Sequence, residues 1–199
     1  MAFATPAPVL IDRLWSADTP NGRLVRMVTL AVIGSLILAI SAKIKIPLEP
    51  VHVTMQVFVI LTIGATMGSR LAVATVLLYL AQGAAGLPVF TGTPEKGIGL
   101  AYMMGGTGGY LLGYVFAAYA VGWLAERGWD RSFFSAGAAM IVGVALIYIP
   151  GVLWLGGLFG WDKPILEWGL YPFIGADLLK AALAMAVMPI AWKLTGKRH

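Results

Sequence analysis

The side chains best suited to chemistry are an aspartate and a lysine that stand three positions apart in an otherwise uncharged apolar stretch. Asp177 and Lys180 are the only charged residues of segment 172–192. A charge at the centre of a membrane-spanning helix costs roughly 2.5 to 3.5 kcal/mol, so a chain that keeps two is expected to use them. At this spacing both side chains lie on one helical face. We predict a functional pair; the alternative is an ion pair that only neutralises itself.

Other kinds of chemistry find little support in the sequence. The chain has no cysteine, which excludes disulfides, thiolate metal sites and cysteine nucleophiles. His52 and His199 cannot face each other inside a membrane, so we expect no haem or other metal site. The glycine-rich segment 92–97 is no Walker A loop, because Ile98 and Gly99 stand where Lys and Ser or Thr are required. We expect no catalytic residue and no cofactor.

The composition places the chain in a membrane. Hydrophobic residues make up 59% of it and charged residues 12%, and the mean hydropathy is +0.85. A water-soluble domain of 199 residues does not have this composition. The net charge of +5 requires no nucleic acid, since membrane proteins concentrate Lys and Arg in their cytoplasmic loops. We therefore predict an integral membrane protein whose surroundings are lipid.

Six apolar runs of helical length predict an all-α bundle with six transmembrane helices. The second and third runs are short and are joined by a tight turn at residues 68–70, so they are expected to form a hairpin. The predicted spans are residues 24–42, 53–68, 71–84, 100–125, 133–158 and 173–194.

The distribution of Lys and Arg predicts the orientation. If the N-terminus lies inside, the inner loops and ends carry most of the basic residues, so both termini are predicted to be cytoplasmic. The pair of charges then lies in the outer half of the sixth span. Residues 1–23 form a cytoplasmic segment, in which 9–15 is either a short interfacial helix or a frayed end. Residues 24–194 form one transmembrane domain, and 195–199 form a basic tail.

The connection 83–106 is long, apolar and rich in glycine and proline. Irregular backbone at membrane depth is tolerated where it lines a cavity, so we predict a ligand lid, with an ordinary outer loop as the alternative. Gln56 lies in the second span, and Tyr79 and Tyr110 border the connection. They are candidate binding residues, although each could instead satisfy a neighbouring backbone group.

Small residues recur every four positions on the first span. Ala31, Ser35 and Ala39 would let a second helix approach closely in the bilayer. This stripe is a candidate docking surface for a partner, and packing within the chain is the alternative.

Several segments together resemble the biotin-transporting BioY family, the substrate-capture (S) components of energy-coupling-factor (ECF) transporters. They are spread in order over residues 46–180, and the one departure is Gly106, where the family is expected to have proline. The matching segments are IPLEP at 46–50 with VTMQ at 53–56, YLAQGAAGLPVF at 79–90, GGTGGYLLG at 105–113 and PFIGADLLK at 172–180.

The resemblance implies a six-helix S-component bundle in the plasma membrane, the inner membrane of a bacterium, with a vitamin site near its outer side. It implies that Asp177 and Lys180 contact biotin, the transported ligand, and that the small-residue stripe meets a partner. The implied partners are a transmembrane T component and two ATPase subunits. Apolar walls for biotin are then expected from Val89, Phe90, Tyr102, Tyr110, Trp168 and Tyr171.

Three other functions remain open at this point. The chain could be an S component for a different vitamin, because S components share their architecture and differ in their pockets. It could be a small proton-coupled carrier in which Asp177 titrates. It could also be a structural subunit in which the charged pair docks a partner helix.

Overall fold

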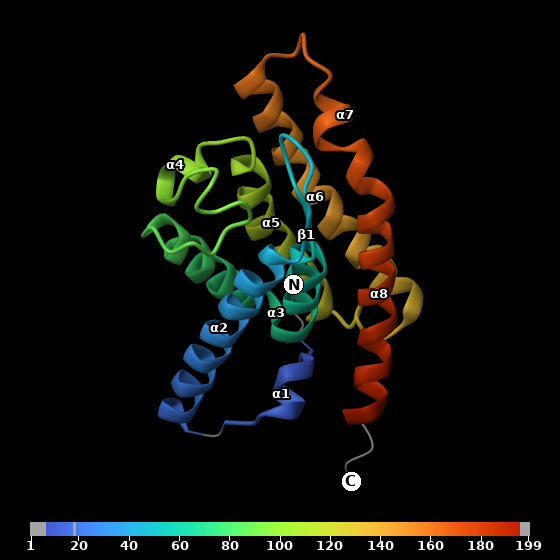
Figure 1. Ribbon diagram of the computed structural model, residues 1–199. Coiled ribbons are helices and arrows are strands. Elements are labelled where there is room, and N and C mark those ends of the chain that lie inside the picture. Colours follow the sequence, from blue (N-terminus) through green and yellow to red (C-terminus); the bar gives the residue numbers. More distant parts are fainter. Residues whose placement is uncertain (1–6, 18, 196–199) are drawn as a thin grey trace, which may run out of the picture.

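The computed structural model describes residues 7–17 and 19–195, which form a helical bundle with one very short strand pair (Figure 1). Strands β1 (Lys45–Ile46) and β2 (Val53–Thr54) pair antiparallel. The helices are α1 (Leu10–Leu14), α2 (Pro20–Lys43), α3 (Gln56–Ala84), α4 (Gly99–Met103), α5 (Gly108–Ala125), α6 (Phe133–Phe159), α7 (Ile165–Gly169) and α8 (Tyr171–Thr195).

Five helical segments of the described chain are long and apolar enough to cross a membrane. They are α2, α3, α5, α6 and the segment Ile165–Thr195, which contains α7 and α8. In Figure 1, α1, the start of α2 and the end of α8 lie at one end of the bundle, and α4 and α7 lie at the other. By length and composition, these segments are those of a multi-pass membrane protein.

Helix α3 contains the span predicted at 71–84 and most of the span predicted at 53–68, whose first two residues form β2 instead. The helix reverses direction between the two spans. Gly68 has a φ of 77°, which interrupts the helix at the predicted turn. Gln56 Nε2 donates a hydrogen bond of 2.8 Å to the hydroxyl of Tyr79, although a straight helix would hold these residues about 34 Å apart. Glu126 stabilises the bend, because its Oε1 accepts from both the backbone N–H and the hydroxyl of Ser69. The two arms therefore lie side by side.

Two helix starts differ most from the predicted ones. The first span begins at Pro20, because Thr19 caps the helix and proline is favoured at its first position. The predicted fourth span, 100–125, is wrong at its start, since a turn after α4 delays α5 to Gly108. Trp154 holds this turn by donating to the carbonyl of Gly105 at 2.9 Å.

Both ends of the chain are only partly described. In the N-terminal segment the short helix α1 forms, and Asp12 pairs with Arg26 of α2 at 3.1 Å. Of the predicted basic tail, residues 196–199 lie outside the described part of the chain.

Helices α3, α5 and α6 form the centre of the bundle, with α2 and α8 on opposite flanks (Figure 1). Gly109 and Gly113 of α5 lie so close to the backbone of α6 at Pro150 and Ile147 that a Cβ atom would clash there. The missing side chains at these glycines let α5 and α6 approach closely. By contrast, much of α2 is uncovered and apolar, as a lipid-facing helix should be.

Candidate functional site

A cavity lies between helices α3, α5, α6 and α8. The connections 44–55 and 83–106 cover one end of it. It has about 520 Å³ of space not filled by atoms, part of it open to solvent. Walls that combine aromatic rings with a few polar groups are usual for small-molecule sites. The lining residues are Val51, His52, Thr54, Gln56, Val57, Tyr79, Phe90, Thr91, Tyr102, Thr107, Tyr110, Leu111, Tyr114, Ile147, Tyr148, Phe173 and Asp177.

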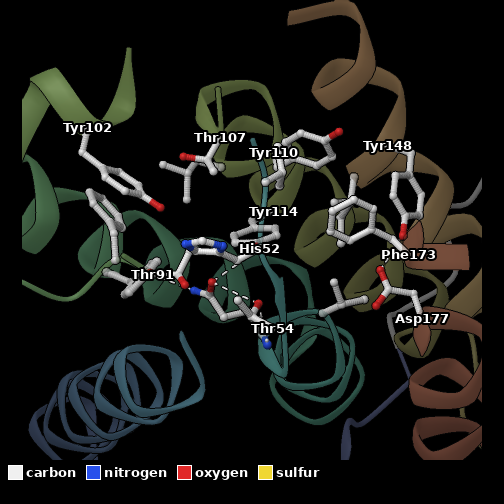
Figure 2. A pocket seen from close by; sticks show the side chains of 17 residues that line it. His52, Thr54, Thr91, Tyr102, Thr107, Tyr110, Tyr114, Tyr148, Phe173 and Asp177 are labelled. Carbon is white, nitrogen blue, oxygen red and sulfur yellow. Dashed lines mark hydrogen bonds between the residues drawn. The ribbon is translucent and has the colours of Figure 1, made fainter. Parts of the chain in front are cut away.

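Asp177 provides the one carboxylate among these lining residues (Figure 2). One of its oxygens accepts from the ammonium of Lys180 at 2.5 Å, and the other accepts from the hydroxyl of Tyr148 at 2.5 Å. Both members of the pair are buried, with 3% and 6% of their surfaces exposed. Lys180 is not a lining residue, so the structure brings the two predicted charges together but presents only the carboxylate to the cavity.

Gln56 and Tyr79 also line the cavity, and their polar atoms are engaged with each other. Besides the bond that joins them, the Tyr79 hydroxyl donates to the carbonyl of Val89 at 3.2 Å. Tyr114 and Thr54 donate to the amide oxygen of Gln56, both at 3.4 Å. These residues form a fixed polar wall. Tyr79 bonds a backbone carbonyl, whereas the side chain of Gln56 bonds only other side chains.

Tyr110 contributes its ring to the cavity. Its hydroxyl donates to the carbonyl of Gly169 at 2.6 Å, in a space kept free by the absence of a side chain at Gly169 and Gly151. The ring lies edge-on to Tyr148, with 6.4 Å between centroids. Tyr110 is therefore an anchored aromatic wall next to Asp177 and its partners.

The connection 83–106 packs over the other end of the cavity. Phe90 stacks on Tyr102 with 4.9 Å between ring centroids and meets Tyr79 edge-on at 5.4 Å. Lys43 fixes the connection from α2, because its ammonium donates to the carbonyl of Phe90 at 2.8 Å and to the hydroxyl of Thr93 at 3.1 Å. Residues 90–93 are buried, so this part of the connection packs over the cavity, whereas residues 94–96 are exposed.

His52 lines the same covered end. One ring nitrogen lies 2.8 Å from the carbonyl of Leu48. Burial lowers the pKa of His52, and the nearby ammonium groups of Lys96 and Lys45 lower it further. The lowered pKa favours the neutral imidazole, and the positively charged side chains near it are those of Lys96 and Lys45.

Sequence reasoning missed several lining residues. His52, Thr91, Tyr114 and Tyr148 were not predicted as site residues, although Tyr114 follows Tyr110 by one helical turn and so shares its face. Polar aromatic residues inside apolar spans were the available signal. Conversely, the structure does not bring Val89, Trp168 and Tyr171 to the cavity.

The small-residue stripe of α2 faces α3. Ser35 is fully buried, and its hydroxyl accepts a hydrogen bond of 3.2 Å from the side chain of Gln82. Ala31 and Ala39 are half-buried. The centre of the stripe is thus occupied within the chain, and only its outer members are partly open.

Comparison with known proteins now places the chain. The model of the BioY family matches residues 13–197, nearly the whole chain. This chain belongs to the BioY family. A relative from Thermotoga maritima, named biotin transporter BioY, is 34% identical over 162 residues, which cover 81% of this chain and 93% of that protein. A relative from Pyrococcus horikoshii, named probable biotin transporter BioY, is 32% identical over 80% of this chain and 92% of its own length.

A solved structure agrees with the BioY assignment. It is described as the S-component for biotin from an ECF-type ABC transporter, and it matches with a TM-score of 0.75 and 26% identity. The match covers 92% of this chain and 96% of that one. The fold of this BioY chain is therefore that of an S-component, and its relatives are transporters rather than enzymes.

Proposed function

We propose that this chain binds biotin in the cavity beside Asp177 and serves as the S component of an ECF uptake system. The observation that carries the proposal is a buried carboxylate at the wall of a cavity lined by aromatic rings, in a chain whose relatives are named biotin transporters. Aromatic walls suit the fused rings and aliphatic chain of biotin.

The hydrogen-bonding capacity of Asp177 fits the ureido ring of biotin. An ionised carboxylate offers about four acceptor positions. Lys180 and Tyr148 occupy two of them, which leaves about two for the two N–H groups of the ureido ring. In this arrangement Lys180 pairs with the buried carboxylate and orients it but does not touch the ligand.

The charges around the cavity favour one orientation of biotin. Its carboxylate would be repelled by Asp177 but attracted toward the covered end, where Lys43 holds the connection and Lys96 and Lys45 lie near His52. Glu49 and Glu95 offset part of this charge, and the three lysines outnumber them. We infer that the ureido ring lies at Asp177 and the carboxylate at the covered end.

The membrane topology that goes with this function has six crossings. The reversal of α3 at Gly68 lets its two arms cross separately, and the other four long segments cross once each. Both termini are then cytoplasmic, as the distribution of Lys and Arg favours, and residues 1–23 and 195–199 flank the transmembrane domain on that side.

Partner subunits supply the energy in this proposal. The chain has no Walker A loop, so ATP would be hydrolysed by two ATPase subunits coupled through a T component. The stripe around Ala31 and Ala39 is proposed to meet the T component in the membrane, with Ser35 supporting it from inside.

A binding titration tests the ligand. Purified protein in detergent is expected to bind radiolabelled biotin to saturation at one molecule per chain, and unlabelled riboflavin or thiamine should not displace it. Displacement by another vitamin would identify that vitamin as the ligand instead of biotin. The absence of saturable biotin binding would refute the proposal.

Uptake by cells tests the energy source. Biotin uptake should require the ATPase subunits and survive collapse of the proton gradient. Uptake without these subunits that stops on addition of an uncoupler would instead identify a proton-coupled carrier.

A further inference from the structure

One polar atom at the covered end of the cavity has no role within the chain. The hydroxyl oxygen of Thr91 is buried and has no hydrogen-bond partner among the described residues. Only 6% of Thr91 is exposed, and the residue lines the cavity. Two further buried side-chain atoms of the described chain lack partners, in Arg26 and Asp130, and neither residue lines this cavity. A buried hydroxyl without a partner is unfavourable, which suggests that a ligand completes it.

The backbone around Thr91 is fixed on both sides. Lys43 donates to the carbonyl of Phe90 and to the hydroxyl of Thr93, and the Thr93 hydroxyl donates to the carbonyl of Phe90 at 2.7 Å. Thr91 stands between these two anchored residues, so rotation about one side-chain bond is the main freedom of its hydroxyl. Figure 2 shows it at the side of the cavity away from Asp177.

We propose that the Thr91 hydroxyl is a specificity-determining contact that donates a hydrogen bond to the carboxylate of the bound ligand. The inference rests on the proposed function and adds the residue that recognises the second end of biotin. A neutral hydroxyl suits this position, because the lysines nearby supply the long-range attraction while the ammonium groups of Lys43 and Lys96 are engaged by other residues of the chain. Hydrogen bonds to charged groups are stronger than those between neutral groups.

Affinities of three proteins for two ligands test the assignment. Thr91→Val keeps the shape and removes the hydroxyl, and Thr91→Ser keeps the hydroxyl. The ligands are biotin and biotinamide, in which a neutral amide replaces the carboxylate. Thr91→Val should bind biotin roughly 10- to 100-fold more weakly than the wild type and lose much less affinity for biotinamide. Thr91→Ser should stay within a few-fold of the wild type for both.

The possible failures are distinguishable. If the wild type binds biotin and Thr91→Val weakens both ligands equally, or neither, the Thr91 contact is refuted while the proposed function stands. If the wild type does not bind biotin, the proposed function fails and takes this inference with it. Thermal unfolding of the variants without ligand separates a folding defect from a binding defect, and Thr91→Ser provides a folded reference.

Discussion

The two ends of the cavity present different groups. At one end the charged carboxylate of Asp177 is held by helices, and at the other the neutral hydroxyl of Thr91 is held by the connection 83–106. Asp177 lies on α8, with both oxygens bonded to residues of the membrane-spanning bundle. Thr91 lies in the connection 83–106, with its hydroxyl unpartnered and its neighbours tied to α2 through Lys43. Leaving a charge unpaired inside a membrane costs much more free energy than leaving a neutral hydroxyl without a hydrogen bond. The hydroxyl can therefore lack a partner until a ligand binds, whereas the carboxylate cannot. The difference predicts strong effects at the first end and smaller ones at the second.

The largest effect is expected from breaking the charged pair. Lys180→Met leaves Asp177 without its cation, and Asp177→Asn removes the ligand acceptor, so each should reduce the affinity for biotin roughly 100-fold or more. Radioligand binding to purified protein measures the loss. Asp130→Asn, at a buried carboxylate away from the cavity, is the matched control and should bind normally.

The double variant Asp177→Asn with Lys180→Met separates a ligand site from a structural pair. Removing both charges of a buried pair is often neutral for stability. The double variant should therefore fold as well as the better single variant and still fail to bind. Recovery of biotin binding in the double variant would show that the pair is only structural.

The packing of the cover gives a smaller effect. The ring of Phe90 lies directly over Gly83, so the methyl group of Gly83→Ala would push it from its place between Tyr79 and Tyr102. Overpacking of this kind costs about 1 to 3 kcal/mol, which corresponds to a loss of affinity on the order of 10-fold. Gly175→Ala on α8 meets no atom within 4 Å and is the control. Equal affinities of the two variants would mean that Phe90 is not part of the site.

The ion pair across the cover should contribute less still. Lys96 and Glu49 meet at 2.6 Å and link the cover to the segment between β1 and β2, but both are partly exposed. Because exposed pairs contribute about 0.2 to 1 kcal/mol, Glu49→Gln should raise the dissociation rate of biotin only a few-fold. Stopped-flow measurements should show the difference shrinking at high salt. A salt-independent change would point to a cause other than charge.

The smallest effect concerns Asp130, a buried carboxylate in which one oxygen has no hydrogen-bond partner among the described residues, whereas each oxygen of Asp177 has one. Burial raises the pKa of Asp130 above its ordinary value of 3.8, although Trp192 donates to the carboxylate. The protonated form therefore favours the folded state, and this contribution is lost as the pH rises through the raised pKa. The melting temperature of Asp130→Asn should therefore increase relative to that of the wild type as the pH rises from about 4 to 8. A constant difference over that range would contradict the assignment.

Much of the fold could be predicted from the sequence, because hydropathy reports directly on helices that face lipid. The bend at Gly68 was predictable for the same reason, since two short apolar runs met at a glycine. The start of α5 was not, because the turn before it depends on a bond from Trp154, some 50 residues away, and the glycines around it are compatible with either a helix or a turn.

The candidate site was predictable where a residue type is costly in a membrane. Asp177 and Lys180 stood out by charge alone, but their division into a cavity-facing carboxylate and a supporting ammonium required the helix to be placed against α6 and Tyr148. Thr91 and His52 could not have been selected as site residues from the sequence, because threonine and histidine are common in connections. Their candidate role here depends on their burial at the cavity. The stripe at Ser35 was ambiguous for a related reason, since close packing within and between chains uses the same small residues.

A crystal structure of this protein with biotin bound tests the central claim most directly. The account predicts that the ureido nitrogens lie within hydrogen-bonding distance of the Asp177 carboxylate and that the ligand carboxylate lies at the covered end beside Thr91. Biotin in the reverse orientation, or bound outside this cavity with Asp177 contacting only Lys180 and Tyr148, would contradict it.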